Sequence, residues 1–270
     1  MRSLWTAASG MKTQQTTVDV IANNLANVNT TAYKTEDAEF KNLLYQTIQA
    51  KTTTKNGEIK PVGAQVGLGV RNASITSIFR QGAFSATENT FDFAINGKGF
   101  FQVQGADGET YYTRNGSFRI SMGTNGTMLT DSEGRPVLDT NGRTIVFDSS
   151  LDTSKITVST TGELCYPDES NNAASMGITL GLVQFPNPAG LEKEGSGLYK
   201  VTDASGEPRM ESRDSELTKS ELRQGYLEAS NVQVADEMVD LIIAQRAYEM
   251  NSKAIQASDD MLSQANSLRR

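Results

Sequence analysis

The chain has 270 residues, a formal net charge of −7, a hydrophobic content of 37%, no histidine and one cysteine. A net negative charge argues against nucleic-acid binding, because a surface that binds phosphates needs clustered Lys and Arg. The absence of histidine removes the commonest general base, metal ligand and pH switch. The single cysteine, Cys165, has no disulfide partner in the chain. We therefore expect no cofactor, no metal and no catalytic residue, and a passive, partly buried thiol at Cys165.

The N-terminal thirty residues show the clearest periodicity in the chain. Residues suited to a helix interface recur at alternating steps of four and three, the pattern of a coiled-coil seam. The predicted seam consists of Leu4, Ala8, Met11, Gln15, Val18, Ala22 and Leu25. Threonines in the same stretch are poor helix formers, so the isolated helix should be marginal in water. We expect it to need a partner. The segment lacks the apolar run of a cleaved signal peptide, and no later stretch has the length and hydropathy of a membrane span.

The next forty residues have a less regular pattern. Residues 36–49 are predicted to form a short helix with its apolar residues on one side. These apolar residues are Phe40, Leu43, Leu44 and Ile48. Residues 52–69 are polar and glycine-rich and are predicted to be a long loop, which in a compact domain is usually functional or disordered.

The middle of the chain changes to a strand-like period of two. Short apolar runs begin at residue 91 and are separated by turn pairs at steps of about ten residues, including Asn115-Gly116 and Asn141-Gly142. Further strands are predicted over residues 155–160, 178–185 and 198–202. The pattern predicts an antiparallel β domain, a small barrel or a sandwich.

The last forty residues return to the helical period. Their predicted seam consists of Val234, Met238, Leu241, Gln245, Tyr248, Ser252, Ile255, Asp259 and Leu262. Ser230 and Gln233 have the spacing of a capping box, which predicts a helix start near Asn231. Each terminal seam carries one glutamine near its middle. Such a residue either sets register and partner choice or is a solvated residue on an imperfect pattern.

Together these patterns predict an α+β chain. Its N- and C-terminal helices pair as a coiled-coil-like layer, with an antiparallel β domain between them. The predicted division assigns residues 1–34 and 230–270 to a terminal helical assembly domain. Residues 35–85 and 205–229 form a linking region with a long extension loop, and residues 86–204 form the β domain.

Five segments carry motifs that, as a set, resemble those of the flagellar basal-body rod and hook protein family. They are residues 20–34 (VIANNLANVNTTAYK), 93–103 (FAINGKGFFQV), 112–118 (YTRNGSF), 225–232 (GYLEASNV) and 245–253 (QRAYEMNSK). The resemblance covers nearly the whole chain in the right order.

Two further segments, residues 40–48 and 63–70, resemble the extension found in distal-rod members of this family. The chain departs from the family pattern at Ala32, where glycine is usual before the aromatic residue. If this position requires a left-handed backbone conformation, alanine costs about 1 kcal/mol.

The resemblance implies a structural subunit and not an enzyme. By resemblance, the terminal helices line the central channel of a self-assembled helical tube that transmits torque, and the β domain forms its outer layer. The implied partners are further copies of the chain, the proximal rod and hook proteins, the flagellar type III export apparatus and ring proteins. No nucleic acid and no membrane insertion are expected. The implied location is the flagellar basal body, reached by export without a cleaved signal peptide.

The expected assembly residues are the helix positions that would pack within or between copies. They are Leu4, Met11, Gln15, Val18, Asn23, Asn24, Leu25, Asn27, Val234, Met238, Leu241, Gln245, Tyr248 and Ile255. The three asparagines have two interpretations: amides that bridge neighbouring copies, or residues that end a helix, where Asn is common.

Two alternatives remain open. One is another axial role in the same family, a proximal rod or short hook subunit. The other is a secreted adhesin or enzyme with a β domain and helical arms, although the absence of histidine weakens its enzymatic version.

Overall fold

The computed structural model describes residues 2–49, 63–123, 126–148, 151–167 and 173–268. The chain divides into two compact units. The first contains residues 1–26, 36–78 and 233–270, and the second contains residues 27–35 and 79–232.

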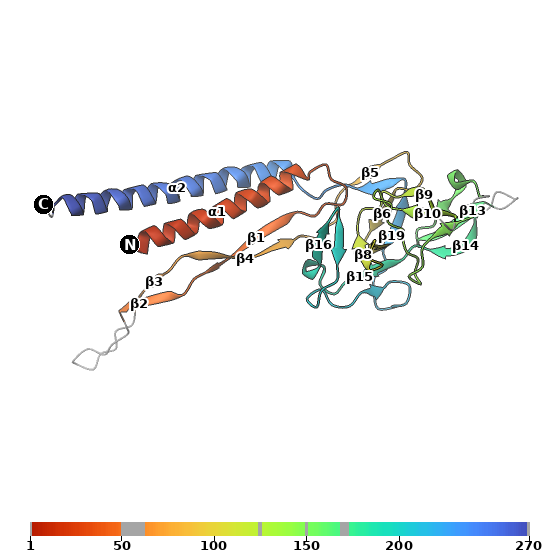
Figure 1. Ribbon diagram of the computed structural model, residues 1–270, viewed down its shortest axis with the longest axis horizontal. Coiled ribbons are helices and arrows are strands. Elements are labelled where there is room, and N and C mark those ends of the chain that lie inside the picture. Colours follow the sequence, from red (N-terminus) through yellow and green to blue (C-terminus); the bar gives the residue numbers. More distant parts are fainter. Residues whose placement is uncertain (1, 50–62, 124–125, 149–150, 168–172, 269–270) are drawn as a thin grey trace, which may run out of the picture. The chain divides into compact units, whose positions relative to one another are not determined.

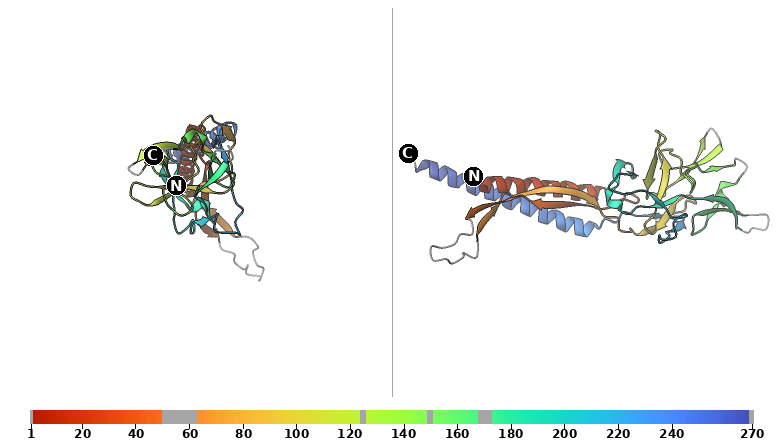
Figure 2. Two further views of the ribbon diagram at one scale, coloured as in Figure 1. Left: turned by 90° about the vertical axis from the view of Figure 1, so that its right-hand side faces the viewer. Right: turned by 90° about the horizontal axis from the view of Figure 1, so that it is seen from below.

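The first unit consists of two helices and a ribbon of strands. The helices α1 (Arg2–Ala26) and α2 (Val234–Ser267) lie side by side (Figure 1). The strands are β1 (Glu36–Asn42), β2 (Tyr45–Gln49), β3 (Ala64–Gly67) and β4 (Val70–Ser77). Strand β1 pairs with β4 and β2 pairs with β3, both antiparallel. The β1–β4 part of the ribbon lies against α1, as the right-hand view of Figure 2 shows.

The prediction of a helix over residues 36–49 was wrong, because this segment forms β1 and β2. The residues of β1 have little intrinsic preference for strand, so its ladder of hydrogen bonds to the distant β4 decides the conformation. The predicted loop over residues 52–69 was wrong at its end, where residues 64–67 form β3. Residues 52–62 lie outside the described residues.

The second unit is an antiparallel β domain. Its strands are β5 (Phe84–Ala86), β6 (Phe93–Asn96), β7 (Phe100–Gln104), β8 (Thr110–Thr113), β9 (Arg119–Gly123), β10 (Gly126–Thr130), β11 (Val146–Phe147), β12 (Thr157–Val158), β13 (Glu163–Pro167), β14 (Ala173–Thr179), β15 (Leu182–Gln184), β16 (Glu192–Gly195), β17 (Leu198–Lys200), β18 (Arg209–Met210), β19 (Glu221–Gln224) and β20 (Tyr226–Glu228). Its largest described sheet has the order β16-β17-β8-β7-β15-β18. Short 3₁₀ turns span Thr153–Lys155 and Pro188–Gly190.

The core of this unit is aromatic and aliphatic. Phe101 and Phe118 are fully buried and meet edge to face, with ring centroids 5.0 Å apart. A second buried cluster surrounds Phe100 on the other face of β7, where its ring meets Tyr199 and Phe185. Alternate residues of β7 therefore supply two cores, as the period-two pattern of the sequence requires. The fold class predicted from the sequence, α+β with a helix at each end of an antiparallel β domain, is confirmed.

The predicted capping box before α2 was wrong. The helix begins at Val234, the preceding Gln233 is extended, and no side chain caps it. The hydroxyl of Ser230 instead accepts the N–H of Val232. Asn231, where the helix start was predicted, contacts Thr35 instead: its side-chain oxygen accepts the N–H and the hydroxyl of Thr35, each at 2.7 Å.

Candidate functional site

The seam between α1 and α2 is built from small and polar residues. Near one end, the hydroxyl of Ser258 donates to that of Ser3 at 3.2 Å. Near the other end, the amide of Asn24 donates to the carboxylate of Glu237 at 3.2 Å. The two pairs are 21 residues apart on each helix, three heptads, so the helices run antiparallel in coiled-coil register.

The helices approach each other closely at Gly10. A Cβ atom at this position would lie 2.9 Å from the side-chain nitrogen of Asn251. This pair falls on the same heptad register as the serine and asparagine contacts. A glycine in a helix interior costs about 1 kcal/mol relative to alanine. At this position it allows α1 and α2 to approach each other more closely than a larger residue would.

The buried residues of both helices differ from the predicted seams. They are Ala7, Thr13, Val20, Ile21 and Asn24 on α1, and Glu237, Ala244 and Ser258 on α2. Helix α1 packs against both α2 and the ribbon. Its most buried residues therefore lie on the side that faces these two neighbours. Of the expected assembly residues besides Asn24, some are half-buried: Leu4, Met11, Val18, Leu25, Asn27, Leu241 and Ile255. The others are exposed: Gln15, Asn23, Val234, Met238, Gln245 and Tyr248.

Four of the expected assembly residues converge on one groove. Gln15 and Val18 of α1 and Gln245 and Tyr248 of α2 line it together with Glu249, and its volume is about 390 Å³. The two glutamines singled out in the two sequence seams therefore lie in the same groove. We refer to these five residues as the seam groove.

Large apolar side chains lie on the outside of the helical pair. On α2, Val239, Ile242, Ile243 and Met250 are each more than half exposed, and Trp5 on α1 is 69% exposed. We call the four α2 residues the outer stripe. Small and polar residues thus contact one another across the helix seam, while the large apolar residues of the outer stripe and Trp5 are exposed.

The ribbon is tied to α1 by polar contacts. Near its centre, the side-chain amide of Asn72 donates to the hydroxyl of Thr16 at 2.7 Å. At the start of β1, Asn24 holds the backbone of Glu36 from both sides, accepting its N–H and donating to its carbonyl, each at 2.9 Å. Asn24 is therefore occupied within the chain by β1 and α2 together.

The other two asparagines also have contacts within the chain. The amide of Asn23 donates to the carboxylate of Glu36 at 3.5 Å, and the side-chain oxygen of Asn27 accepts the hydroxyl of Thr30 at 3.0 Å. A role for the asparagines in bridging copies stays a prediction.

Glu237 is an acid placed in the seam of the first unit, and only 8% of its surface is exposed. Burial raises its pKa above the ordinary value, the Asn24 hydrogen bond opposes that shift, and the nearby Asp240, Asp37 and Asp236 raise the pKa further. The seam therefore favours the protonated form of this side chain.

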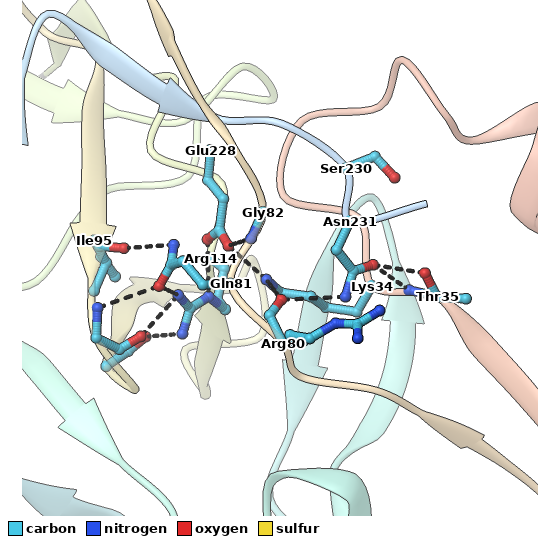
Figure 3. Close-up of polar contacts among 12 residues, drawn as sticks. Lys34, Thr35, Arg80, Gln81, Gly82, Ile95, Arg114, Glu228, Ser230 and Asn231 are labelled. Carbon is cyan, nitrogen blue, oxygen red and sulfur yellow. Dashed lines mark hydrogen bonds and ion pairs between the residues drawn. The ribbon is translucent and has the colours of Figure 1, made fainter. Parts of the chain in front are cut away.

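The second unit contains a buried charge cluster that sequence reasoning did not assign (Figure 3). The carboxylate of Glu228 accepts Lys34 Nζ at 2.6 Å, Gly82 N–H at 2.8 Å and Arg114 Nε at 3.1 Å. Each of the three charged side chains is at most 4% exposed. Burial lowers the pKa of Lys34 and the positive charge of Arg114 lowers it further, while Glu228 opposes both.

The available sequence signal for this cluster was the motif set itself. Lys34, Arg114 and Glu228 lie in three different motifs that carry the family resemblance. No periodicity places residues so distant in sequence together, so only the fold reveals their contact.

Ala32 adopts the left-handed conformation, with φ of 58°. Its N–H donates to the backbone carbonyl of Glu228 at 2.8 Å, and the residue is buried. The position therefore does require the conformation that glycine adopts freely, and alanine adopts it at a cost of about 1 kcal/mol.

Three further features bear on function: the single cysteine, possible metal ligands and possible membrane spans. Cys165 is a free, half-buried thiol. The described residues contain no group of three or more Cys, Asp or Glu side chains that could hold a metal ion. None of the helices in the described part of the chain is long and apolar enough to cross a membrane.

Three family models match the chain. Residues 4–34 match "Flagella basal body rod protein", residues 94–166 match "Flagellar hook protein FlgE/F/G D1 domain" and residues 223–268 match "Flagellar basal body rod FlgEFG protein C-terminal". These matches cover nearly all of both helices and, within the β domain, residues 94–166.

Curated relatives match over nearly the full length. The chain is 46% identical to the flagellar basal-body rod protein FlgG of Borreliella burgdorferi, over 100% of this chain and 99% of the relative. It is 42% identical to the protein of that name in Agrobacterium fabrum, over 97% of each chain, and 40% identical to that of Buchnera aphidicola, over 98% and 99%. The chain belongs to the flagellar basal-body rod family. It is a structural subunit of the bacterial flagellar rod, and its relatives fit the distal-rod type.

Proposed function

We propose that copies of this chain pack through the exposed faces of α1 and α2 into a hollow helical tube that carries torque as the distal rod. One observation carries the proposal: the intramolecular seam is small and polar, whereas the outer stripe and Trp5 expose large apolar side chains. Burying apolar surface yields about 25 cal/mol per Å², so these faces favour a further packing partner.

The two surfaces proposed for contact between copies, the seam groove and the outer stripe, differ from each other. The seam groove and the outer stripe consist of different residues, so a contact between them joins two different patches of two copies. Contacts of this head-to-tail kind produce either rings or open helical filaments, depending on whether the rotation closes. A helical rod is the open case.

The remaining parts receive proposed roles in the same assembly. The terminal helices form the inner layer and the β domain forms the outer one. The subunit acts without catalysis, is exported by the flagellar type III apparatus without a cleaved signal, and joins the proximal rod and hook proteins.

The test is polymerisation of the purified full chain, followed by sedimentation and electron microscopy. Ile242→Glu combined with Ile243→Glu should abolish polymers while leaving the monomer folded, because both side chains are solvent-exposed. The matched control is Met122→Glu, an apolar residue 91% exposed on β9, which should polymerise as the wild type does. Normal polymers from the double variant would refute assembly through the outer stripe.

Electron microscopy also separates the second candidate, a proximal rod or short hook subunit. A distal rod subunit should form straight, rigid tubes. Curved or readily bending tubes would favour the hook role.

A further inference from the structure

The chain passes between the two compact units at four places, after Ala26, Thr35, Ile78 and Val232. Within the second unit, these passages lead into three segments: residues 27–35, 79–83 and 228–232. Whatever force or motion travels along the chain into the second unit must enter through these segments.

All three segments meet at one side chain. Glu228 belongs to the third segment. Its carboxylate binds Lys34 of the first and the N–H of Gly82 of the second (Figure 3). Its backbone carbonyl accepts the N–H of Ala32. One residue thus makes direct hydrogen bonds to both of the other segments.

Additional contacts tie the segments to each other. The backbone carbonyl of Arg80 accepts Lys34 Nζ at 3.0 Å and the side-chain amide of Asn231 at 3.1 Å. The side-chain oxygen of Asn231 accepts the N–H and hydroxyl of Thr35. Each pair of segments is therefore bridged by at least one side chain.

Arg114 attaches this arrangement to the sheet. Besides Glu228, its guanidinium donates to the carbonyls of Gly97 at 3.0 Å and Gly99 at 3.1 Å, between β6 and β7. Because all three charged side chains are almost fully buried, water does not compete for these hydrogen bonds. Charge-assisted bonds of this kind are directional and strong, unlike an apolar contact that can slide.

We propose that Lys34, Glu228 and Arg114 form a clamp that holds the chain passages together where they enter the β unit, so that torque enters this unit through fixed hydrogen bonds. The inference rests on the proposed torque-carrying function and assigns these three as positioning residues.

Lys34→Met is the informative variant. It removes one of two cations from a single carboxylate and leaves the Arg114–Glu228 pair, in which one positive and one negative charge balance. The carbonyl of Arg80 keeps its bond from Asn231. The full-length variant should fold, and hydrogen exchange of the Ala32 and Tyr33 amides should accelerate about tenfold or more because charge-assisted bonds are lost.

One control separates a clamp from simple stabilisation. Leu164→Ala, chosen for its fully buried side chain in the β core, lowers stability without touching the cluster. Asn231→Ala is a second clamp variant, for use if Lys34→Met fails to fold.

The functional readout is the torsional stiffness of rods in cells that express each variant. Rods with Lys34→Met or Asn231→Ala should assemble to normal length yet twist more under load than rods with Leu164→Ala of matched or lower thermal stability. Equal stiffness, or unchanged exchange in residues 27–35, would overturn the clamp alone. If the wild-type chain forms no torque-carrying rod, the proposed function falls, and the clamp's role falls with it.

Discussion

Asn24 and Glu237 meet across the α1–α2 seam, and the same asparagine holds both backbone groups of Glu36 at the start of β1. One side chain thus joins three elements that are separate in sequence. Because Asn24 and Glu237 are both buried, the Glu237 carboxylate left without Asn24 would lose a hydrogen bond that water does not replace.

Asn24→Ala should lower the free energy of unfolding by about 1–3 kcal/mol, since it removes hydrogen bonds from the buried Glu237 carboxylate and from the half-buried backbone of Glu36. Urea denaturation of the full chain measures this. Asn23→Ala is the matched control, because the contact of Asn23 with the Glu36 carboxylate is long, 3.5 Å, and exposed. It should cost less than about 0.5 kcal/mol. Equal losses from the two variants would contradict the role of Asn24.

Glu237→Gln should change how stability depends on pH. The folded state raises the pKa of Glu237, chiefly through burial, so folding favours its protonated form. The stabilisation is therefore greatest below the ordinary carboxyl pKa and is lost as pH rises through the raised value. The glutamine variant keeps the oxygen that accepts from Asn24 and cannot ionise.

Urea midpoints at pH values from about 4 to 8 would check this. The variant should match the wild type at the acidic end and exceed it at the neutral end. A constant difference at all pH values would show that Glu237 does not titrate in this range.

Ala32→Gly should stabilise the second unit by about 1 kcal/mol, because glycine adopts the φ of 58° without strain. The gain is reduced by the greater entropy of glycine in the unfolded chain. Ala229→Gly provides the comparison, since Ala229 is outside the left-handed region; it should cost about 0.5–1 kcal/mol. Thermal unfolding measures both, and destabilisation by Ala32→Gly would count against backbone strain at this position.

Gly10→Leu should separate the helices and cost about 1–3 kcal/mol through overpacking against Asn251. The loss should shrink when Asn251→Ala is added, because the shorter side chain leaves room. Gly10→Ala in that background should be stabilising by about 1 kcal/mol, the helix preference of alanine over glycine. A double-mutant cycle measures this coupling, and additive effects would contradict direct contact between the two positions.

Particular residues show what could be predicted from the sequence. The heptad steps at both ends located the helices, and alternation around β7 located the β domain. Four residues predicted for assembly, Gln15, Val18, Gln245 and Tyr248, line one groove. The buried residues of the two helices differ from the predicted seam positions. The helical period indicates which residues share a face, but not which neighbouring element covers that face. The ribbon was missed because β1 depends on pairing with β4 more than on its own residues.

The sequence by itself determined the α+β order of elements and, through its motifs, the family, because periodicity and motif spacing are local properties of the chain. Only the tertiary structure decided which faces of the helices meet and which remain exposed. It also decided that Lys34, Arg114 and Glu228 form one buried cluster. The physical reason is that a buried cation is tolerated only beside a carboxylate, and contacts between residues so distant in sequence arise only when the chain folds.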